Sequence, residues 1–213
     1  MTLWFATGNA HKRDELRAIL PEHEIRLPSD AGIVCAPKET GATFLDNALL
    51  KARALYALVH EPVVADDSGL CVDCLGGRPG VYSARYGGER GGRLSVSERN
   101  ALLLRKIGDS PLRSARFVCA MALLLDENRL CFVQETLEGE IIRDGARGTG
   151  GFGYDPLLYL PEQGCTIAEL SETEKNAVSH RGKAGRGIAA VLRSACAERS
   201  SFLGKPPHAV ACY

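Results

Sequence analysis

The most restrictive feature of the sequence is a short apolar run that stops at two adjacent carboxylates. Residues 62–65 (PVVA) predict a buried strand, and Asp66 and Asp67 follow it directly. Like charges side by side repel each other and are costly to remove from water, so a fold holds them at a strand end only beside water, a metal or a positive group. The chain must therefore fold so that a compensating partner reaches this strand end.

Predicted strands and helices alternate along the chain, except near its middle. Asn9 is a suitable N-cap for a helix over residues 9–20, and Thr43, with an aspartate three residues later, predicts the capping box of a second helix. The apolar runs 115–126 and 129–142 are separated by a short turn and predict an antiparallel strand pair. This order predicts an α/β fold on a mixed sheet. Further strands are expected at 2–6 and 157–160, and further helices at 95–107 and toward residue 198.

Two glycine-rich segments interrupt these elements. Residues 75–93 combine glycine with proline and predict a long structured loop, and residues 143–156 place five glycines around a Phe, a Tyr and an Asp. Loops of this length are usually functional. The length suits one domain, which we expect to span residues 1–199 in two lobes, followed by a loose tail over residues 200–213.

Composition narrows the range of partners. Lys and Arg together number 26, as do Asp and Glu, so no net charge is available to hold a nucleic-acid backbone. Positive residues gather between positions 175 and 186, which suits a small phosphate-bearing ligand. No apolar stretch reaches the roughly 18 residues of a membrane span, and the N-terminus lacks a signal-peptide profile. We therefore expect no nucleic-acid or membrane partner and a cytoplasmic protein.

Eight cysteines are scattered along the chain, mostly within apolar runs, where Cys acts as a small hydrophobic residue. Cys71 and Cys74 form a CxxC motif, which a redox pair or half of a zinc site would also show. The other cysteines supply no second CxxC and no histidine at zinc-finger spacing. The sequence therefore favours reduced thiols with a structural role.

The turn between the first strand and the first helix, TGNAHK at residues 7–12, is a candidate anion site. Free backbone N–H groups and the positive end of the helix dipole favour an anion there. Gly8 allows a ligand to approach closely, and Lys12 adds positive charge. An ordinary turn with a surface lysine has the same pattern, so this motif alone leaves both interpretations open.

Carboxylates on two separate segments indicate a metal. Glu39 lies in the loop before the second helix and joins Asp66 and Asp67 as a possible ligand set. Mg²⁺ prefers few carboxylates together with water and phosphate oxygens, and ligands of open α/β sheets bind beyond the carboxyl ends of strands. We therefore expect the partner of the two aspartates to be a metal ion bound with a phosphate.

Two further motifs predict recognition of a base. In GTGGFGYD the glycines leave Phe152 as a ring that can stack on a base and Asp155 as an acceptor. Ser179 is the expected N-cap of the last helix, so His180 and Arg181 fall in its first turn, where cations are unfavourable. We therefore expect these two side chains to bind acceptors on a base or phosphate. A glycine-rich turn with an aromatic plug and a salt-bridged surface turn are the competing interpretations.

Five segments resemble the inosine triphosphate pyrophosphatase family, also called dITP/XTP pyrophosphatases, in their order and spacing over roughly residues 2–193. The resemblance is greatest to the bacterial branch of the family. They are TGNAHK, ETGATFLDNALLKA, ADDSGLCVDCLGGRPGVYSARY, GTGGFGYDP and EKNAVSHRGKA. The resemblance implies an elongated mixed β-sheet with flanking helices that form two lobes around a central cleft, and a homodimer. It also implies Mg²⁺-dependent hydrolysis of ITP, dITP and XTP to the monophosphate and pyrophosphate, which cleanses the nucleotide pool.

The resemblance further implies roles for individual residues. Glu39 and Asp67 match the metal-binding acids of the family, and Asp67 also its catalytic general base. Donors from Arg181 or His180 would suit the 6-oxo group of hypoxanthine and xanthine, whereas adenine would present a facing donor. The substrate-binding positions match Thr7, Gly8, Asn9, Ala10, His11, Lys12, Ser68, Phe152, Gly153, Tyr154, Asp155, Lys175, His180 and Arg181.

Two other function classes share parts of this pattern. A haloacid-dehalogenase-like phosphatase also ends a strand in aspartates, but one residue separates its two acids, whereas Asp66 and Asp67 are adjacent. A nucleotide-sensing module that binds without turnover would lack an acid at Glu39 or at Asp67, and both are present. The sequence therefore favours the pyrophosphatase.

Overall fold

The fold is built on one seven-stranded sheet, which the computed structural model describes over residues 1–88 and 94–203. The strand order is β2-β1-β3-β4-β5-β6-β7. β1 is parallel to β2 and β3, and the other neighbouring strands are antiparallel, which confirms the predicted mixed sheet. The strands are β1 (Thr2–Phe5), β2 (Glu24–Arg26), β3 (Val63–Val72), β4 (Ser114–Asp126), β5 (Arg129–Ile141), β6 (Leu158–Leu160) and β7 (Cys165–Thr166).

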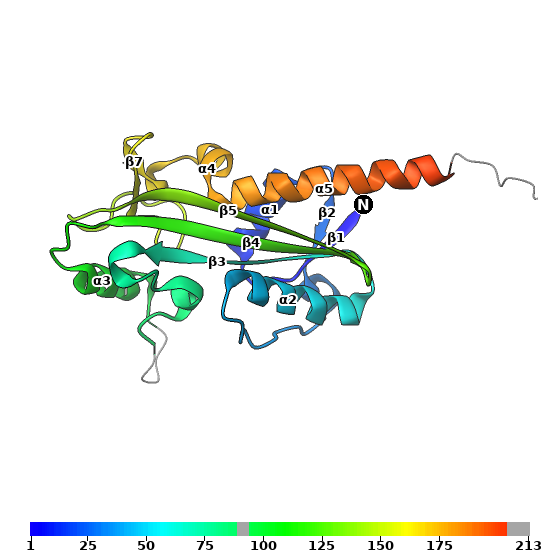
Figure 1. Ribbon diagram of the computed structural model, residues 1–213, viewed down its shortest axis with the longest axis horizontal. Helices are drawn as coiled ribbons and strands as arrows, with labels where there is room; N and C mark the ends of the chain where they lie inside the picture. The colour runs from blue at the N-terminus through cyan, green and yellow to red at the C-terminus, as the bar shows by residue number, and fades with distance from the viewer. Residues whose placement is uncertain (89–93, 204–213) are drawn as a thin grey trace, which may run out of the picture.

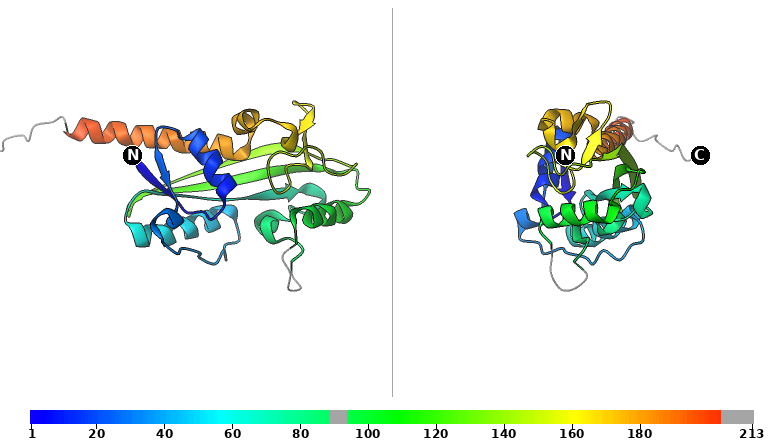
Figure 2. Two further views of the ribbon diagram at one scale, coloured as in Figure 1. Left: turned by 180° about the vertical axis from the view of Figure 1, so that it is seen from behind. Right: turned by 90° about the vertical axis from the view of Figure 1, so that its left-hand side faces the viewer.

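Helices cover both faces of the sheet, and the long strands β4 and β5 give the molecule its elongated shape (Figure 1). α1, α4 and α5 lie on one face, and α2 and α3 lie on the other, as the reverse and end-on views also show (Figure 2). Within the described ranges, none of these helices has the length and apolar character that crossing a membrane requires. The helices are α1 (Ala10–Ile19), α2 (Phe44–Val59), α3 (Val96–Ile107), α4 (Glu172–Val178) and α5 (His180–Leu203).

The predicted helix caps are confirmed. The side chain of Asn9 accepts hydrogen bonds from the first backbone N–H groups of α1. Thr43 and Asp46 form a reciprocal capping box at the start of α2. The hydroxyl of Ser179 accepts from the backbone N–H of Gly182 at 3.0 Å, so it caps α5. These caps define where α1, α2 and α5 begin.

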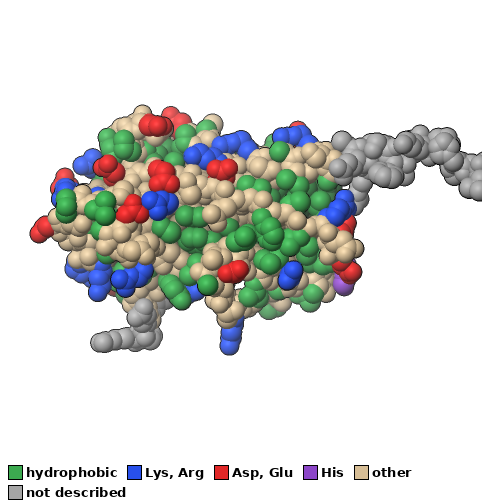
Figure 3. Space-filling model, viewed as in Figure 1, with side chains coloured by type: hydrophobic (Ala, Val, Ile, Leu, Met, Phe, Trp, Pro, Cys, Tyr) green, Lys and Arg blue, Asp and Glu red, His purple; other side chains and the backbone are tan. Residues whose placement is uncertain are grey.

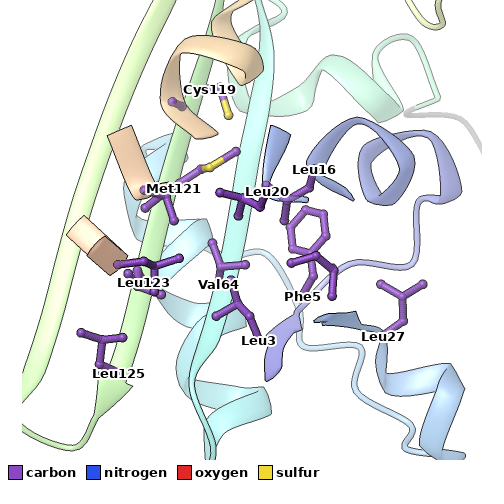
Figure 4. Close-up of a cluster of buried hydrophobic side chains, with 14 residues drawn as sticks. Leu3, Phe5, Leu16, Leu20, Leu27, Val64, Cys119, Met121, Leu123 and Leu125 are labelled. Carbon is purple, nitrogen blue, oxygen red and sulfur yellow. The ribbon is translucent and has the colours of Figure 1, made fainter. Parts of the chain in front are cut away.

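The core forms two layers, one on each side of the sheet. Between the sheet and the pair α1 and α5, side chains such as Phe5, Leu16 and Met121 pack together in a fully buried cluster (Figure 4). On the opposite face, Ala48 and Leu55 of α2 pack against the sheet, as their helical spacing predicts. The small alanines of α2 let this helix lie close to β3 and β4.

Some elements differ from expectation. β2 and β7 were not predicted, because strands of three and two residues are too short to show a period. α5 continues to Leu203 and so takes in the first residues of the expected tail. The rest of that tail, 204–213, and residues 89–93 of the expected long loop lie outside the described residues. The described part of that loop contains a short 3₁₀ segment, Gly80–Arg85.

The cysteines pack as hydrophobic residues. The thiols of Cys35, Cys71, Cys74, Cys119, Cys131 and Cys165 are free. Cys74 packs against the cluster beside α3, whereas Cys71 packs against the cluster around Phe44 and Ala120. The CxxC residues therefore belong to different parts of the core, in line with a structural role.

Candidate active site

One pocket of about 630 Å³ gathers the candidate residues. It is lined by the β1–α1 turn, the loop before α2, the middle of β3, the glycine-rich loop at residues 150–155, and the junction of α4 and α5. Of the candidate substrate, metal and catalytic residues, Ala10 and Asp66 lie outside its lining. The volume is within the range of roughly 300–1,000 Å³ that small-molecule sites occupy.

Asp66 and Asp67 lie in the middle of β3 and not at a strand end, so that part of the sequence prediction was wrong. β1 pairs with β3 only as far as Phe5 and Val64, whereas β3 continues along β4 to Val72. The aspartates therefore follow the end of the parallel pairing but remain inside an antiparallel ladder. Successive side chains of a strand point to opposite faces, so the two carboxylates are separated by the sheet itself.

Asp66 faces α1 and α5, where two cations from the chain compensate it. The ammonium of Lys12 lies 2.9 Å from its carboxylate, and Nε of Arg181 lies 3.2 Å from it. Burial opposes its ionisation, but Lys12 and Arg181 outweigh burial and hold the pKa of Asp66 well below its usual range. The expected partner of this aspartate, a metal with a phosphate, is thus replaced by two side chains.

Arg181 links three elements although its side chain is almost wholly buried. Its Nη1 donates to Glu15 of α1, and its Nη2 donates to the hydroxyl of Ser68 at 2.7 Å, in addition to the contact of Nε with Asp66. Two buried carboxylates raise the pKa of Arg181 further against the effect of burial. A salt-bridged surface turn is therefore excluded as the interpretation of this segment.

Lys175 extends the same network toward the glycine-rich loop. Its ammonium lies 2.8 Å from both Glu15 and Asp155. Asp155 also accepts from the backbone N–H of Phe152 at 2.8 Å, and burial raises its pKa even though Lys175 acts against this. Gly151 has a φ of +68°, and a Cβ there would overlap the Asp155 carboxylate, so this turn requires glycine. The loop is thereby fixed to α4.

The ring of Phe152 lies among cations and a second ring. His11 stacks on it with centroids 5.4 Å apart, and the ammonium of Lys175 lies 4.6 Å from its centroid. The guanidinium carbon of Arg181 lies 5.6 Å from the same centroid. Tyr154 differs from Phe152, because it is buried and its hydroxyl donates to the backbone carbonyl of Ser83, which anchors the loop.

His180 is buried and neutral. Its ring stacks on Phe117 with centroids 4.9 Å apart, and its Nδ1 is a buried atom without a hydrogen-bond partner in the described structure. Burial, followed by the nearby charge of Arg181, lowers the pKa of His180 well below 6.5. The first turn of α5 therefore carries one cation rather than two, which removes most of the expected conflict with the helix dipole.

Asp67 faces α2 on the other side of the sheet. Asn47 donates to its Oδ2 at 3.1 Å, and the ammonium of Lys51 lies 3.2 Å from its Oδ1. Burial raises the pKa of Asp67, while Lys51 and Lys12 act against this shift. The same ammonium of Lys51 lies 2.8 Å from Glu39. Lys51 thus joins the two carboxylates that were expected to bind metal.

The donor set of Glu39 and Asp67 fits Mg²⁺. Within the described residues, no three Asp, Glu, His or Cys side chains come together as a complete metal centre. The two carboxylates nevertheless converge on one cation, the ammonium of Lys51. Mg²⁺ is commonly held by one or two carboxylates and completes its shell with water and phosphate oxygens. Asp66 does not belong to this set, because its carboxylate is already paired with Lys12 and Arg181.

The turn at residues 7–12 is less open to an anion than the sequence indicated. The backbone N–H groups of His11 and Lys12 both donate to the side chain of Asn9, and the ammonium of Lys12 contacts Asp66. Gly8 faces open space, since a Cβ there would meet no atom within 4 Å. The turn therefore offers close approach and a movable lysine rather than a preformed ring of free donors.

Sequence reasoning missed two charged residues that organise the site. Glu15 joins Lys175 and Arg181, and Lys51 joins Glu39 and Asp67. Helical spacing was the available signal, because Glu15 follows Lys12 by three residues and shares its face of α1. Lys51 follows Asn47 by four residues and shares its face of α2 in the same way.

The fold and site define an α/β protein with a pocket suited to a planar, phosphorylated ligand. Comparisons with known proteins identify its family. A model of the Ham1 family matches residues 3–191. The chain is 50% identical over 184 residues to the dITP/XTP pyrophosphatase of Treponema denticola, covering 86% of this chain and 94% of that protein. It is 48% identical over 199 residues to that of Streptomyces coelicolor, covering 90% and 96%. The chain belongs to the Ham1 family.

Solved structures agree with this assignment. The HAM1 protein from Coxiella burnetii superposes with a TM-score of 0.82 at 37% identity, covering 91% of this chain and 99% of that one. The Ham1 protein of Staphylococcus aureus gives 0.80 at 36% identity, with the same coverage. The family resemblance and the fold inferred from the five motifs are thus confirmed.

Proposed function

We propose that this protein hydrolyses ITP, dITP and XTP to the monophosphate and pyrophosphate, with Mg²⁺ as cofactor. Relatives that are 43–50% identical over most of the chain carry the name dITP/XTP pyrophosphatase. The observation that carries the proposal is that two chemically different groups line one pocket. Glu39, Asp67 and Lys51 are joined on the α2 side of β3, and Phe152 contacts Lys175 of α4; we call these two groups the ends of the pocket.

The end with Glu39 and Asp67 suits the triphosphate. When bound there, Mg²⁺ would neutralise charge on the phosphate oxygens in the transition state. Lys12 and Lys51 are the ammonium groups nearest to the two aspartates, and each can turn from its carboxylate to a phosphate oxygen. Gly8 leaves room for a phosphate beside the start of α1.

Asp67 is the group we assign as general base. Its raised pKa makes it a better proton acceptor than an ordinary aspartate, and Asn47 and Lys51 hold its two oxygens in a fixed orientation. Water would transfer a proton to this carboxylate while its oxygen forms a bond to phosphorus. The bond between the α- and β-phosphates breaks, and pyrophosphate leaves with the electron pair.

The end with Phe152 suits the base. The ring provides a stacking surface, and Arg181 and Lys175 retain N–H groups beyond those donated to their carboxylate partners. A 6-oxo purine can accept from these donors, whereas adenine would place its amino group against them. His180 is neutral, so it can present either a donor or an acceptor to the base.

The reaction is tested by turnover of ITP, dITP, XTP, GTP and ATP with Mg²⁺, measuring pyrophosphate and orthophosphate separately. We expect pyrophosphate from the first three, and a loss of at least about 100-fold in kcat for Asp67→Asn, since general-base catalysis contributes that much. Asp73→Asn is the matched control. Asp73 directly follows β3 in the chain but pairs with Arg116 outside the pocket. Release of orthophosphate would point instead to a phosphatase.

Selectivity is best tested at Arg181 with a substitution that keeps its charge. Arg181→Ala would remove one of two cations from Asp66, which keeps Lys12, and one of two from Glu15, which keeps Lys175, and would thus disturb the buried network as well as the donors. Arg181→Lys retains the positive charge but loses the planar donor fork. We expect the ratio of kcat/KM for ITP over ATP to fall by about tenfold or more. The exposed Arg186, on the same helix, provides the control Arg186→Lys, and an unchanged ratio for Arg181→Lys would contradict the donor argument.

We further propose a cytoplasmic homodimer. Free cysteines favour a reducing compartment, where nucleoside triphosphates are also found. Hydrophobic side chains gather over the face formed by β4, β5 and α2 (Figure 3). Phe132 of β5 is 45% exposed. Leu130, two residues away on the same face of the strand, packs with Tyr56 against the cluster under α2. β5 pairs with β6 only at Glu140 and Ile141, so most of its outer edge also has no neighbouring strand in the described sheet. A second copy of the chain would cover both the apolar face and the unpaired edge of β5.

A further inference from the structure

Arg85 is a charged residue at the pocket that the proposed reaction does not yet use. It ends the 3₁₀ segment Gly80–Arg85, and its Nη1 donates to Oε2 of Glu39 at 3.0 Å. The other oxygen of Glu39 accepts from Lys51 at 2.8 Å. Both oxygens of the carboxylate assigned to the metal are therefore bound by cations of the chain.

The charges of this group cancel. Glu39 and Asp67 contribute two negative charges, and Lys51 and Arg85 contribute two positive charges through direct contacts. A divalent ion that joined this group alone would leave a net charge of about +2 in a partly buried site, which is unfavourable. A triphosphate brings about four negative charges, so the metal and the nucleotide together would change the net charge from about +2 to about −2. The cations of the group would then find acceptors on the phosphates.

We propose that Arg85 changes partners during binding, holding Glu39 in the nucleotide-free protein and binding the triphosphate when the metal takes Glu39. The inference rests on the proposed function, because it assigns the metal to Glu39 and Asp67. It deepens that function by making Arg85 a substrate-binding residue. It also makes tight metal binding depend on the nucleotide.

The position of Arg85 allows this movement. Its side chain is 43% exposed, so the guanidinium can leave Glu39 without opening the core. Its guanidinium carbon lies 4.9 Å from the ring centroid of Tyr82, which is itself 58% exposed. The two preceding residues, Ser83 and Ala84, line the pocket, which places the backbone of Arg85 beside the space that the triphosphate would fill.

The first test measures metal binding without nucleotide, using Mn²⁺ and the electron paramagnetic resonance signal of the free ion. We expect Arg85→Gln to bind Mn²⁺ about two- to fivefold more tightly than the unchanged protein, because a competing cation is removed from Glu39. Arg85→Lys keeps the charge and should stay close to the unchanged protein. Arg116→Gln is the matched control, because Arg116 has a similar exposure and a 3.0 Å contact with Asp73 away from the pocket.

The second test measures nucleotide binding by calorimetry, using Mg²⁺ and an ITP analogue with a methylene group between the α- and β-phosphorus atoms. We expect Arg85→Gln to weaken binding of this complex by about tenfold, since a charged hydrogen bond to phosphate is lost. If Arg85 had a purely structural role, Arg85→Gln would weaken the binding of both metal and nucleotide, or of neither. Opposite effects on metal and nucleotide are therefore the specific result expected.

Two outcomes separate failure of this inference from failure of the metal assignment. If Glu39→Gln abolishes Mn²⁺ binding but Arg85→Gln leaves both affinities unchanged, the exchange of partners is wrong and the metal site stands. If Glu39→Gln leaves Mn²⁺ and Mg²⁺-dependent nucleotide binding intact, the proposed metal site is itself wrong. Weaker Mn²⁺ binding by Arg85→Gln would also overturn the inference, because the residue would then be supporting the site.

Discussion

Asp66 and Asp67 are tolerated as neighbours because the strand turns them to opposite faces of the sheet. Asp66 is neutralised by Lys12 and Arg181, and its carboxylate holds the buried guanidinium in place. Asp67 meets a single lysine and an amide, and its pKa is raised rather than lowered. One strand thus carries a permanently ionised structural acid beside a more basic acid that suits catalysis.

The sequence identified most of these residues but not their partners. Acids, glycines and the Phe–Gly–Tyr–Asp segment stand out because their pattern matches a family over residues 3–191. The ion pairs join residues that are far apart in sequence, such as Glu15 with Arg181. Such a pair depends on how α1 packs against α5, and no local pattern encodes that packing. This is why a metal seemed necessary where two side chains already compensate the charge.

His180 predicts a measurable dependence of stability on pH. Its pKa in the folded protein lies well below 6.5, so between these values the unfolded chain binds one proton more than the folded protein. Stability is therefore complete above about pH 6.5 and falls as the pH is lowered, by up to about 1.4 kcal/mol per pH unit. Denaturant titrations of the unchanged protein and His180→Asn between pH 7.5 and about pH 5 should show a shallower decline in the variant.

The control for this prediction is His11→Asn, which changes an exposed histidine at the pocket mouth and leaves the buried ring in place. Its decline with pH should match that of the unchanged protein. His23 contributes equally to all three proteins, so differences between them report on the substituted residue alone. Equal slopes for the His180 variant and the unchanged protein would contradict the prediction, because His180 would then bind a proton as readily in the folded protein as in the unfolded chain.

At the scale of elements, the junction of α4 and α5 sets the position of the base-binding residues. α4 ends at Val178, Ser179 closes one helix and caps the next, and α5 begins at His180. The capping chemistry of Ser179 was predictable from sequence, as was the capping box of α2. The close approach of the two helices was not, because it requires knowing which backbone atoms meet at the bend.

Gly182 makes this close approach possible, and we expect Gly182→Ala to destabilise the fold. A Cβ at Gly182 would overlap the backbone carbonyl oxygen of Asn176, which cannot move without displacing α4. Overpacking against a rigid neighbour typically costs about 1–3 kcal/mol, and we expect the upper part of that range. Chemical denaturation measures the loss, and weaker binding of the ITP analogue would show that His180 and Arg181 have shifted.

Gly185→Ala is the matched control, one turn further along α5. A Cβ there would lie 2.8 Å from a methyl group of Ile19, a side chain that can adjust. Alanine also favours a helix over glycine by about 1 kcal/mol, so the net change should remain within about 1 kcal/mol. Similar losses for both variants would show that the α4–α5 bend is less rigid than its geometry indicates.

At the scale of the whole molecule, the long strands β4 and β5 connect the two ends of the protein. One end carries β1, β2 and α2 with the acids of the pocket, and the other carries α3, β6 and the loop with Phe152. The pocket is lined by residues of both parts. A strand pair of this length was evident from sequence. The short edge strands were not, because they are fixed by pairing with neighbours rather than by their own pattern.

The exposed apolar face over β4, β5 and α2 leads to the last prediction. Phe132 stands on this face and is 45% exposed, so Phe132→Ser should leave the fold intact but weaken association of two copies by about tenfold or more. Sedimentation at micromolar concentration measures the dissociation constant directly. Leu112→Ser is the matched control, because Leu112 is 51% exposed at the end of the molecule near α3, away from this face. A monomeric unchanged protein would refute the dimer, and an unaffected dimer in Phe132→Ser would place its interface on another surface.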